Sequence, residues 1–233
     1  MINKDKYLIN REKFKKKLKK KKFFEIVDHW ALYVGIKNLA KFLFLFDEIK
    51  KTFNLEGDIA ELGSWKGTNV VFFAKILKIY SKIKKRVYCF DSFDGIKTFV
   101  EQDGIHINKY FGTYKGDLNE LNKVIKLYNL EGVLKIQKGL IQKTVPSFFK
   151  KNPKKLFSLV YYDADLYEPA KVMLDYFSSR MVKNGVIMFD EWNKKDFQGE
   201  TMAVNEFLKK NKNFKKIIPK NTDQPSLVIK RIF

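Results

Sequence analysis

From Gly57 onward, short apolar runs with the character of strands alternate with segments of helical spacing, at residues 70–83, 118–130, 147–152 and 171–181. Five runs have the strand pattern, at residues 58–62, 87–90, 133–137, 158–162 and 185–189. Strand and helix alternating in this way are typical of a doubly wound, mostly parallel sheet. Two apolar segments near the end, 214–220 and 226–233, predict strands that close one edge of the sheet in the antiparallel direction.

The first 50 residues have a different character. Residues 11–22, REKFKKKLKKKK, form the densest basic run, and residues 23–50 carry apolar side chains at helical spacing. We therefore expect a basic helical arm over 1–50, followed by an α/β domain over 51–233. The sequence has no uninterrupted run of 18 or more apolar residues, so it predicts no transmembrane helix. The start MINKDKYLIN lacks the pattern of a signal peptide. A single cysteine, Cys89, fits a cytoplasmic protein.

The formal net charge of +21 suggests an anionic partner such as nucleic acid, a membrane or a phosphate-bearing substrate. Proteins that grip nucleic acid favour arginine for its bidentate contacts. Of the 47 basic residues here, only Arg11, Arg86, Arg180 and Arg231 are arginine. The lysine excess, alongside abundant Phe, Ile and Asn, favours codon bias, so we expect no nucleic-acid partner. A weak contact between the basic arm and an anionic membrane stays open.

A glycine loop follows the first predicted strand. Gly63 and Gly67 allow a tight turn and a close approach of the backbone to a ligand. A helix that begins after Gly67 would offer free N–H groups and the positive end of its dipole. The spacing matches neither the dinucleotide pattern GxGxxG nor the P-loop pattern GxxxxGK[ST].

Asp91 ends the second predicted strand, 28 residues (91 − 63) after Gly63. An acid at that place can accept hydrogen bonds from both ribose hydroxyls of a bound nucleoside. A long loop then runs from residue 93 to about 115 and contains His106, Tyr110 and Tyr114, which could cover a substrate.

Acidic residues follow the fourth and fifth strands, Asp163 and Asp165 after one and Asp190 and Glu191 after the other. Adjacent parallel strands lie about 4.8 Å apart, so four unpaired carboxylates there would repel one another. A hard cation such as Mg²⁺ or Ca²⁺ would resolve this, and neutralisation by lysines is the alternative. The chain has two histidines, which disfavours a zinc or iron site built on histidine.

With these motifs in order, the sequence resembles the TylF/MycF family of macrocin-type sugar O-methyltransferases over about residues 55–233. The matching pieces are GDIAELGSWKG (57–67), FDSFDGI (90–96), KGLIQKTVP (138–146), LVYYDADLYEPAKVMLDYF (159–177), GVIMFDEW (185–192), AVNEFL (203–208) and SLVIKR (226–231). The resemblance implies a Rossmann-like class I methyltransferase fold, S-adenosylmethionine as methyl donor, Mg²⁺ or a similar divalent cation, and a sugar hydroxyl as acceptor. The basic run 11–22 is not part of it.

By position, the resemblance and the loop motifs together assign the candidate site. The predicted cofactor-binding residues are Glu61, Gly63, Ser64, Gly67, Asp91, Ser92 and Gly139. Asp163, Asp190 and Glu191 match the metal ligands, although the family usually has two aspartates where this chain has Asp190-Glu191. Asp165 is the predicted general base, with Asp163 as the alternative.

The predicted function is therefore O-methylation of a sugar, nucleotide-linked or in a glycoside, in polysaccharide or natural-product biosynthesis. An RNA methyltransferase, suggested by the charge, and a catechol-type O-methyltransferase with similar metal chemistry are the alternative enzymes. A protein that only binds a membrane or partner through its arm would have no need of the acidic clusters. Which sugar, which hydroxyl and which oligomeric state, a homo-oligomer included, the sequence leaves open.

Overall fold

The computed structural model describes residues 23–233, with side chains from Ile26 onward. It divides into two compact units, one that ends at Leu39 and one that comprises Ala40–Phe233. The described part of the first unit is helical, with α2 (Phe23–Asp28), α3 (Trp30–Tyr33) and the start of α4 (Ile36–Lys51). The predicted basic run 11–22 lies outside the described residues.

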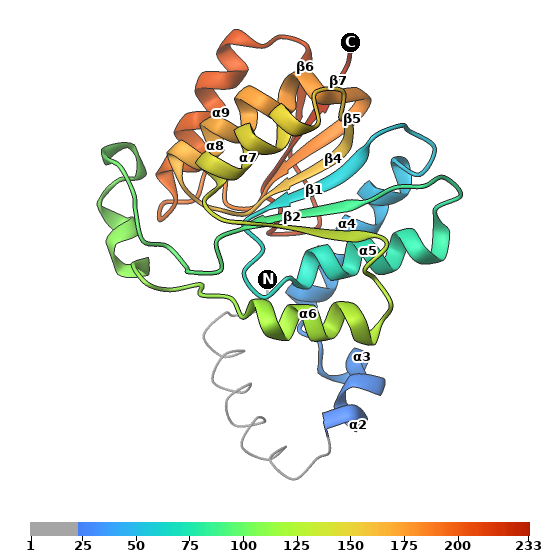
Figure 1. The fold of residues 1–233 in the computed structure, drawn as a ribbon. Helices are drawn as coiled ribbons and strands as arrows, with labels where there is room; N and C mark the ends of the chain where they lie inside the picture. Colours follow the sequence, from blue (N-terminus) through green and yellow to red (C-terminus); the bar gives the residue numbers. More distant parts are fainter. Residues whose placement is uncertain (1–22) are drawn as a thin grey trace. The chain divides into compact units, whose positions relative to one another are not determined.

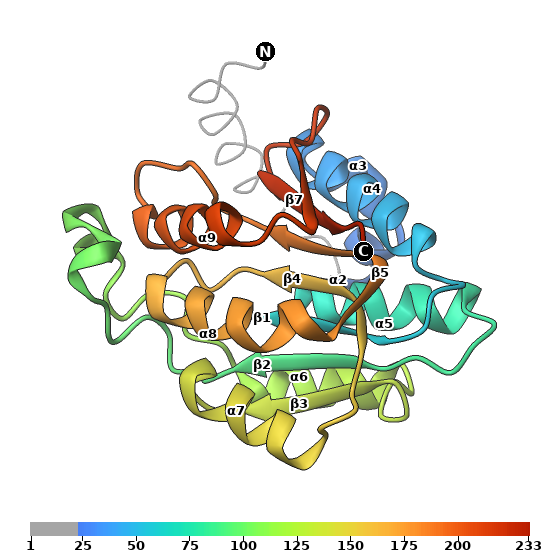
Figure 2. The same ribbon diagram turned by 90° about the horizontal axis from the view of Figure 1, so that it is seen from above.

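Within the described residues, the second unit contains one seven-stranded sheet, in the order β3-β2-β1-β4-β5-β7-β6. The strands are β1 (Asp58–Leu62), β2 (Val87–Asp91), β3 (Leu134–Lys138), β4 (Phe157–Tyr162), β5 (Met181–Phe189), β6 (Phe214–Ile217) and β7 (Leu227–Arg231). The first five run parallel, and β7 pairs antiparallel with both β5 and β6. Figures 1 and 2 show the central strands between two layers of helices.

Five helices follow the strands in the second unit. They are α5 (Thr68–Tyr80), α6 (Leu118–Leu127), α7 (Ile141–Lys151), α8 (Tyr167–Phe177) and α9 (Gln198–Lys210). Short 3₁₀ turns, η2 (Glu101–Asp103), η3 (Ile105–Tyr110) and η4 (Ser178–Arg180), lie in the connections. Helices α7, α8 and α9 cover one face of the sheet, and α5 and α6 cover the other (Figure 1).

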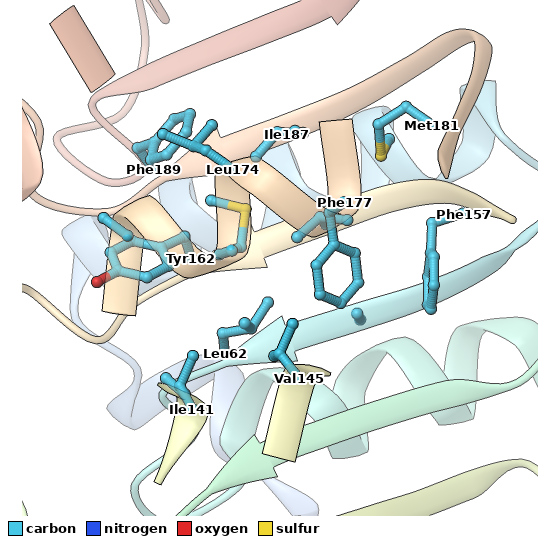
Figure 3. Packing of buried hydrophobic residues seen from close by; sticks show 14 of the residues in the cluster. Leu62, Ile141, Val145, Phe157, Tyr162, Leu174, Phe177, Met181, Ile187 and Phe189 are labelled. Carbon is cyan, nitrogen blue, oxygen red and sulfur yellow. The ribbon is translucent and has the colours of Figure 1, made fainter. Parts of the chain in front are cut away.

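The two faces of the sheet bury separate hydrophobic layers because side chains alternate along each strand. On β1, Ala60 and Leu62 pack with the α7, α8 and α9 layer, whereas Ile59 packs with the α5 and α6 layer. Figure 3 shows part of the first layer, in which Phe177 of α8 lies close to Phe157 of β4 at a ring-centroid distance of 4.7 Å. Burial on both faces explains why these parallel strands are nearly continuous apolar runs.

The predicted fold class is confirmed: a mostly parallel, doubly wound sheet ends in an antiparallel edge. Differences concern boundaries. Strand β5 begins at Met181 rather than at residue 185, and α7 begins at Ile141 and continues through Pro146. Helix α9 was not among the predicted segments. No helix in the described part of the chain is long and apolar enough to cross a membrane.

The boundary between the arm and the α/β domain also differs from the predicted one at residue 50. Leu45 and Ile49 of α4 are fully buried and pack in the same layer as Val70 and Phe73 of α5. The second half of α4 therefore belongs to the core of the second unit, which begins at Ala40.

Candidate active site

A cavity of about 290 Å³ opens at the carboxyl ends of β1, β2, β4 and β5. It lies where the strand order reverses, between β1 and β4, which is the usual ligand site of an open α/β sheet. The predicted site residues in its lining are Gly63, Asp91, Ser92, Asp163, Asp165, Asp190 and Glu191. The other predicted residues, Glu61, Ser64, Gly67 and Gly139, lie outside the lining as the described residues define it.

The glycine loop connects β1 to α5, and both glycines have left-handed backbone angles, with φ of +84° at Gly63 and +80° at Gly67. A Cβ atom on Gly63 would lie 2.1 Å from the carbonyl oxygen of Asp163, and one on Gly67 would lie 2.6 Å from Cδ1 of Leu121. The protein's own atoms thus require both glycines. We expected them to make room for a ligand, but their first role is to let the loop pack against β4 and α6.

Asp91 holds that loop through its carboxylate. Its Oδ2 accepts hydrogen bonds from the backbone N–H of Ser64 at 2.6 Å and of Trp65 at 2.8 Å. Its Oδ1 accepts one from the backbone N–H of Phe93 at 2.5 Å, at the start of the long loop. Asp91 therefore ties the glycine loop to the end of β2, and its contact with a ribose stays a prediction.

Glu61, on β1, is almost completely buried. Its Oε1 accepts a hydrogen bond from the Asn69 side chain at 2.8 Å, and its Oε2 is buried without a partner among the described residues. Burial raises the pKa of Glu61 to about 7, against the lowering effect of the Asn69 hydrogen bond. The neighbouring Ser64 hydroxyl is likewise buried and unpaired in the described structure, so the loop has unfilled capacity for polar contacts.

The predicted acidic residues do come together, since β4 pairs with β5 in parallel. Lys41 of α4 joins them: its Nζ lies 2.9 Å from Oδ1 of Asp190 and 4.0 Å from Oδ2 of Asp163. The Tyr161 hydroxyl donates to the same Asp190 oxygen. The Gln224 side chain donates to Oε1 of Glu191.

The protonation of this cluster follows from its burial. Removal from bulk water raises the pKa of Asp163 and of Asp165 well above the ordinary range, and the charge of Asp190 adds to both shifts. Burial and Asp190 likewise raise the pKa of Glu191 to about 7. Burial alone would lower the pKa of Lys41, but the charges of Asp190 and Asp163 outweigh it and raise that pKa to about 12. Lys41 is therefore a permanent cation in a cluster that favours protonated carboxyl groups.

These contacts test the predicted metal site. In the part of the chain that the structure describes, no group of three or more His, Cys, Asp and Glu side chains is arranged to hold a metal ion. Oδ1 of Asp190 already accepts from Lys41 and Tyr161, and Oε1 of Glu191 accepts from Gln224. This arrangement does not fit a divalent cation. The assignment of Asp163, Asp190 and Glu191 as metal ligands thus stays a prediction without structural support.

Aromatic side chains also line the cavity. Trp65 and Tyr114 line it and meet edge to face, with ring centroids 5.6 Å apart. Phe197 also lines it and stacks on Tyr110, whose hydroxyl donates to Asp196. The predicted covering loop thus contributes Tyr114 directly and Tyr110 through Phe197. Aromatic rings and carboxyl groups in one lining suit the apolar faces and the hydroxyls of a sugar.

Several residues of this site were missed by the sequence analysis. Lys41 is one lysine among many on an expected arm, and nothing in the spacing distinguishes it. Gln224 follows no strand or motif. Glu200, on α9, is fully buried and its Oε1 accepts from the backbone N–H of Glu191 at 3.0 Å. Its helical spacing to the apolar residues Ala203 and Val204 was the one available signal, and that signal required α9 to be recognised first.

The sheet order, the glycine loop tied to an acid at the end of β2 and the cavity at the reversal point are those of a class I methyltransferase. A family model described as macrocin O-methyltransferase (TylF) matches residues 5–224. The chain belongs to this family, whose members are O-methyltransferases. The match begins at residue 5, so the expectation that the resemblance starts near residue 55 and excludes the basic run 11–22 was wrong.

The individual proteins that this chain resembles are also methyltransferases by name. A curated protein of Streptomyces olivaceus, 8-demethyl-8-(2,3-dimethoxy-α-L-rhamnosyl)-tetracenomycin-C 4′-O-methyltransferase, is 22% identical over 166 residues, which are 68% of this chain. The aligned part spans 61% of that relative's length. The crystal structure of CalS11, a calicheamicin methyltransferase, is 20% identical, with a TM-score of 0.84 over 99% of this chain and 94% of CalS11. The O-methyltransferase NovP has a TM-score of 0.70 at 20% identity, over 86% of this chain and 81% of NovP.

Proposed function

We propose that this protein transfers the methyl group of S-adenosylmethionine to a hydroxyl oxygen of a sugar. The observation that carries the proposal is one cavity with the Asp91-held glycine loop on one side and Asp163 and Asp165 on the other. Family membership supports a sugar acceptor over the RNA and catechol alternatives. The relative from Streptomyces olivaceus carries a rhamnosyl group in its name, and CalS11 is described as a TDP-rhamnose 3′-O-methyltransferase. We therefore propose a rhamnose-like deoxyhexose, nucleotide-linked or in a glycoside, and a natural-product or polysaccharide pathway.

The cofactor supplies an electrophilic methyl group on a positively charged sulfur. Gly63, Trp65, Asp91 and Ser92 line the cavity on the side of β1 and β2 and are the residues that would hold it. Asp91 has both carboxylate oxygens on the loop backbone, so it keeps the cofactor side in one shape before any ligand arrives. In-line placement of donor and acceptor is then the main contribution of the protein.

On the acceptor side, Asp165 is the proposed general base and Asp163 the alternative. Asp165 is buried in the cavity wall and is held at a left-handed φ of +65°. A base works only when it has lost its proton. Because the pKa of Asp165 is raised, we expect turnover to increase as the pH rises through that pKa. No step of this reaction is assigned to a divalent cation.

The test is incubation of the purified chain with S-adenosylmethionine that carries a labelled methyl group and a panel of nucleotide-linked sugars and rhamnosides. Label should appear on a deoxyhexose, and a variant without the base, Asp165→Asn, should transfer far less. Transfer to RNA that weakens steeply with salt, with no transfer to any sugar, would support the RNA alternative instead.

We further propose that the basic run 11–22 is dispensable for chemistry. The cavity lining, as far as the structure describes it, begins at Lys41. Deletion of residues 1–22 should leave turnover of a soluble acceptor largely intact. We also propose that the enzyme is cytoplasmic. A folded deletion variant that has lost turnover would show that the arm contributes to the site. Flotation with anionic vesicles tests its membrane contact separately.

A further inference from the structure

The acidic cluster of the cavity has a cation of its own. Lys41 is the described ammonium group within ion-pair distance of both Asp190, at 2.9 Å, and Asp163, at 4.0 Å. The two acids follow different strands, β5 and β4, so one side chain from α4 bridges the two strand ends. Its side chain is 17% exposed and that of Asp190 is 4% exposed, which removes most of the solvent that would otherwise screen the pair.

The position of Lys41 is fixed by more than charge. Its Nζ lies 5.3 Å from the ring centroid of Tyr161, a distance typical of a cation–π contact. The hydroxyl of the same tyrosine donates to Oδ1 of Asp190, the oxygen that also accepts from Lys41. Ammonium, phenol and carboxylate therefore form a closed set of contacts, of which Lys41 and Asp190 line the cavity.

Two further acids, Glu191 and Glu200, each have one carboxylate oxygen that accepts from a protein donor. Glu191 accepts from the Gln224 side chain, and its backbone N–H donates to Glu200. A divalent ion that used Asp163 and Asp190 would have to displace the Lys41 ammonium from between them or share the space with it. Like charges at that separation repel strongly away from bulk water.

We propose that Lys41 is the resident cation of this site, a positioning residue that holds Asp163 and Asp190 in the place of a divalent metal ion. It acts through these carboxylates and leaves Asp165 free for the acceptor. The turnover readout of this proposal rests on the proposed function, whereas its metal-binding readout does not. The enzyme is then a metal-independent member of its family.

The first experiment measures metal binding to the full-length chain, without any acceptor. Titration with Mn²⁺, followed by electron paramagnetic resonance, should show no specific site in the wild type. Lys41→Ala empties the space between Asp163 and Asp190 and should gain a site for Mn²⁺. Lys50→Ala, an exposed lysine on the same helix, is the matched control and should bind no more than the wild type. A specific Mn²⁺ site in the wild type would overturn the proposal, as would no gain in a folded Lys41→Ala.

The second experiment uses turnover. EDTA should leave the wild type unchanged, and Lys41→Gln should lower kcat by roughly 10- to 100-fold, the usual cost of losing a group that orients a site residue. Lys41→Arg keeps the charge and should recover part of the loss, and added Mg²⁺ should partly rescue Lys41→Ala. Circular dichroism and cofactor binding establish that each variant folds. Loss of wild-type turnover in EDTA, restored by Mg²⁺, or unchanged turnover in Lys41→Gln would refute the role. If no acceptor is found at all, the proposed function fails while the Mn²⁺ titration still decides the role of Lys41.

Discussion

The two halves of the cavity hold their carboxylates in different ways. In the half formed by β1 and β2, Asp91 accepts from three backbone N–H groups, the most distant of them 27 residues away in sequence. In the half formed by β4 and β5, Asp190 accepts from side chains, and its partner Lys41 is 149 residues away. The first half is a local backbone structure, whereas the second is a set of side chains assembled by the tertiary fold.

This difference has a physical consequence. The backbone N–H groups of a tight loop are present whichever side chains the loop carries. The shape of the first half therefore depends mainly on its glycines and on one acid, Asp91. The second half places several acids away from water, and it is stable only while each keeps a partner or a proton. We therefore expect substitutions in the second half to change chemistry and those in the first half to change folding and cofactor affinity.

The largest effect is expected from Asp165→Asn in the side-chain half. The amide keeps the shape of the carboxyl group and cannot accept a proton, so turnover should fall by roughly 10²–10⁴-fold, the usual contribution of a general base. Steady-state kinetics with a sugar acceptor measures the fall, and calorimetry should show cofactor affinity close to that of the wild type.

Asp163→Asn is the matched comparison for this prediction. If it loses as much turnover as expected for Asp165→Asn while Asp165→Asn stays active, the roles of the two residues are reversed. Normal turnover in both variants would mean that the proton leaves through water or another group.

The next largest effect is expected from Gly63→Ala in the backbone half. Its φ of +84° disfavours any side chain, and the new Cβ would lie 2.1 Å from the Asp163 carbonyl oxygen. Left-handed strain and overpacking together should lower the free energy of unfolding by about 2–4 kcal/mol, as measured by urea denaturation.

Gly132→Ala is the control, because a Cβ at Gly132 meets nothing within 4 Å. It should change stability little. Since Gly63 packs against the backbone of Asp163, Gly63→Ala should also disturb the acidic half. A stable Gly63→Ala variant with normal kinetics would show that the two halves are independent.

Asp91→Ala should have a smaller effect, on cofactor affinity. The variant removes the acceptor of three loop N–H groups, so the loop would lose its fixed shape and any direct contact with a ribose. We expect S-adenosylmethionine to bind roughly 10- to 100-fold more weakly in calorimetry, equivalent to about 1.4–2.7 kcal/mol. Asp94→Ala, an exposed acid three residues on, should bind normally. Unchanged affinity in Asp91→Ala would remove Asp91 from the cofactor site.

The same comparison explains what the sequence could predict. The strands, their parallel direction and the acids at their ends follow from nearly continuous apolar runs that alternate with helical segments, and from the rule that parallel strand ends meet at one edge. Asp91 and Gly63 were found for that reason. Lys41, Gln224 and Glu200 come from α4, the segment before β7 and α9, and their contacts depend on packing that no local pattern encodes. The sequence analysis weighed neutralisation by lysines against a metal ion, but no local pattern indicated that packing would place Lys41 beside Asp163 and Asp190.

Glu61 is an exception to the difference between the two halves. It lies in the half formed by β1 and β2, yet its carboxyl group accepts from a side chain, that of Asn69. Its pKa is raised from 4.5 to about 7 by burial, so the folded protein favours its protonated form. The stability that it contributes is fully present below about pH 4.5 and is lost as the pH rises through about 7. Glu61→Gln cannot ionise. Its free energy of unfolding should therefore match that of the wild type below about pH 4.5 and exceed it by about 1–3 kcal/mol at pH 8. Urea denaturation at an acid pH in that range and at pH 8 measures both values. Glu131→Gln, at an exposed position, should show no such divergence. If the gap between Glu61→Gln and the wild type is the same at both pH values, folding leaves the pKa of Glu61 unshifted, and a partner of its Oε2 offsets the cost of burying the charge.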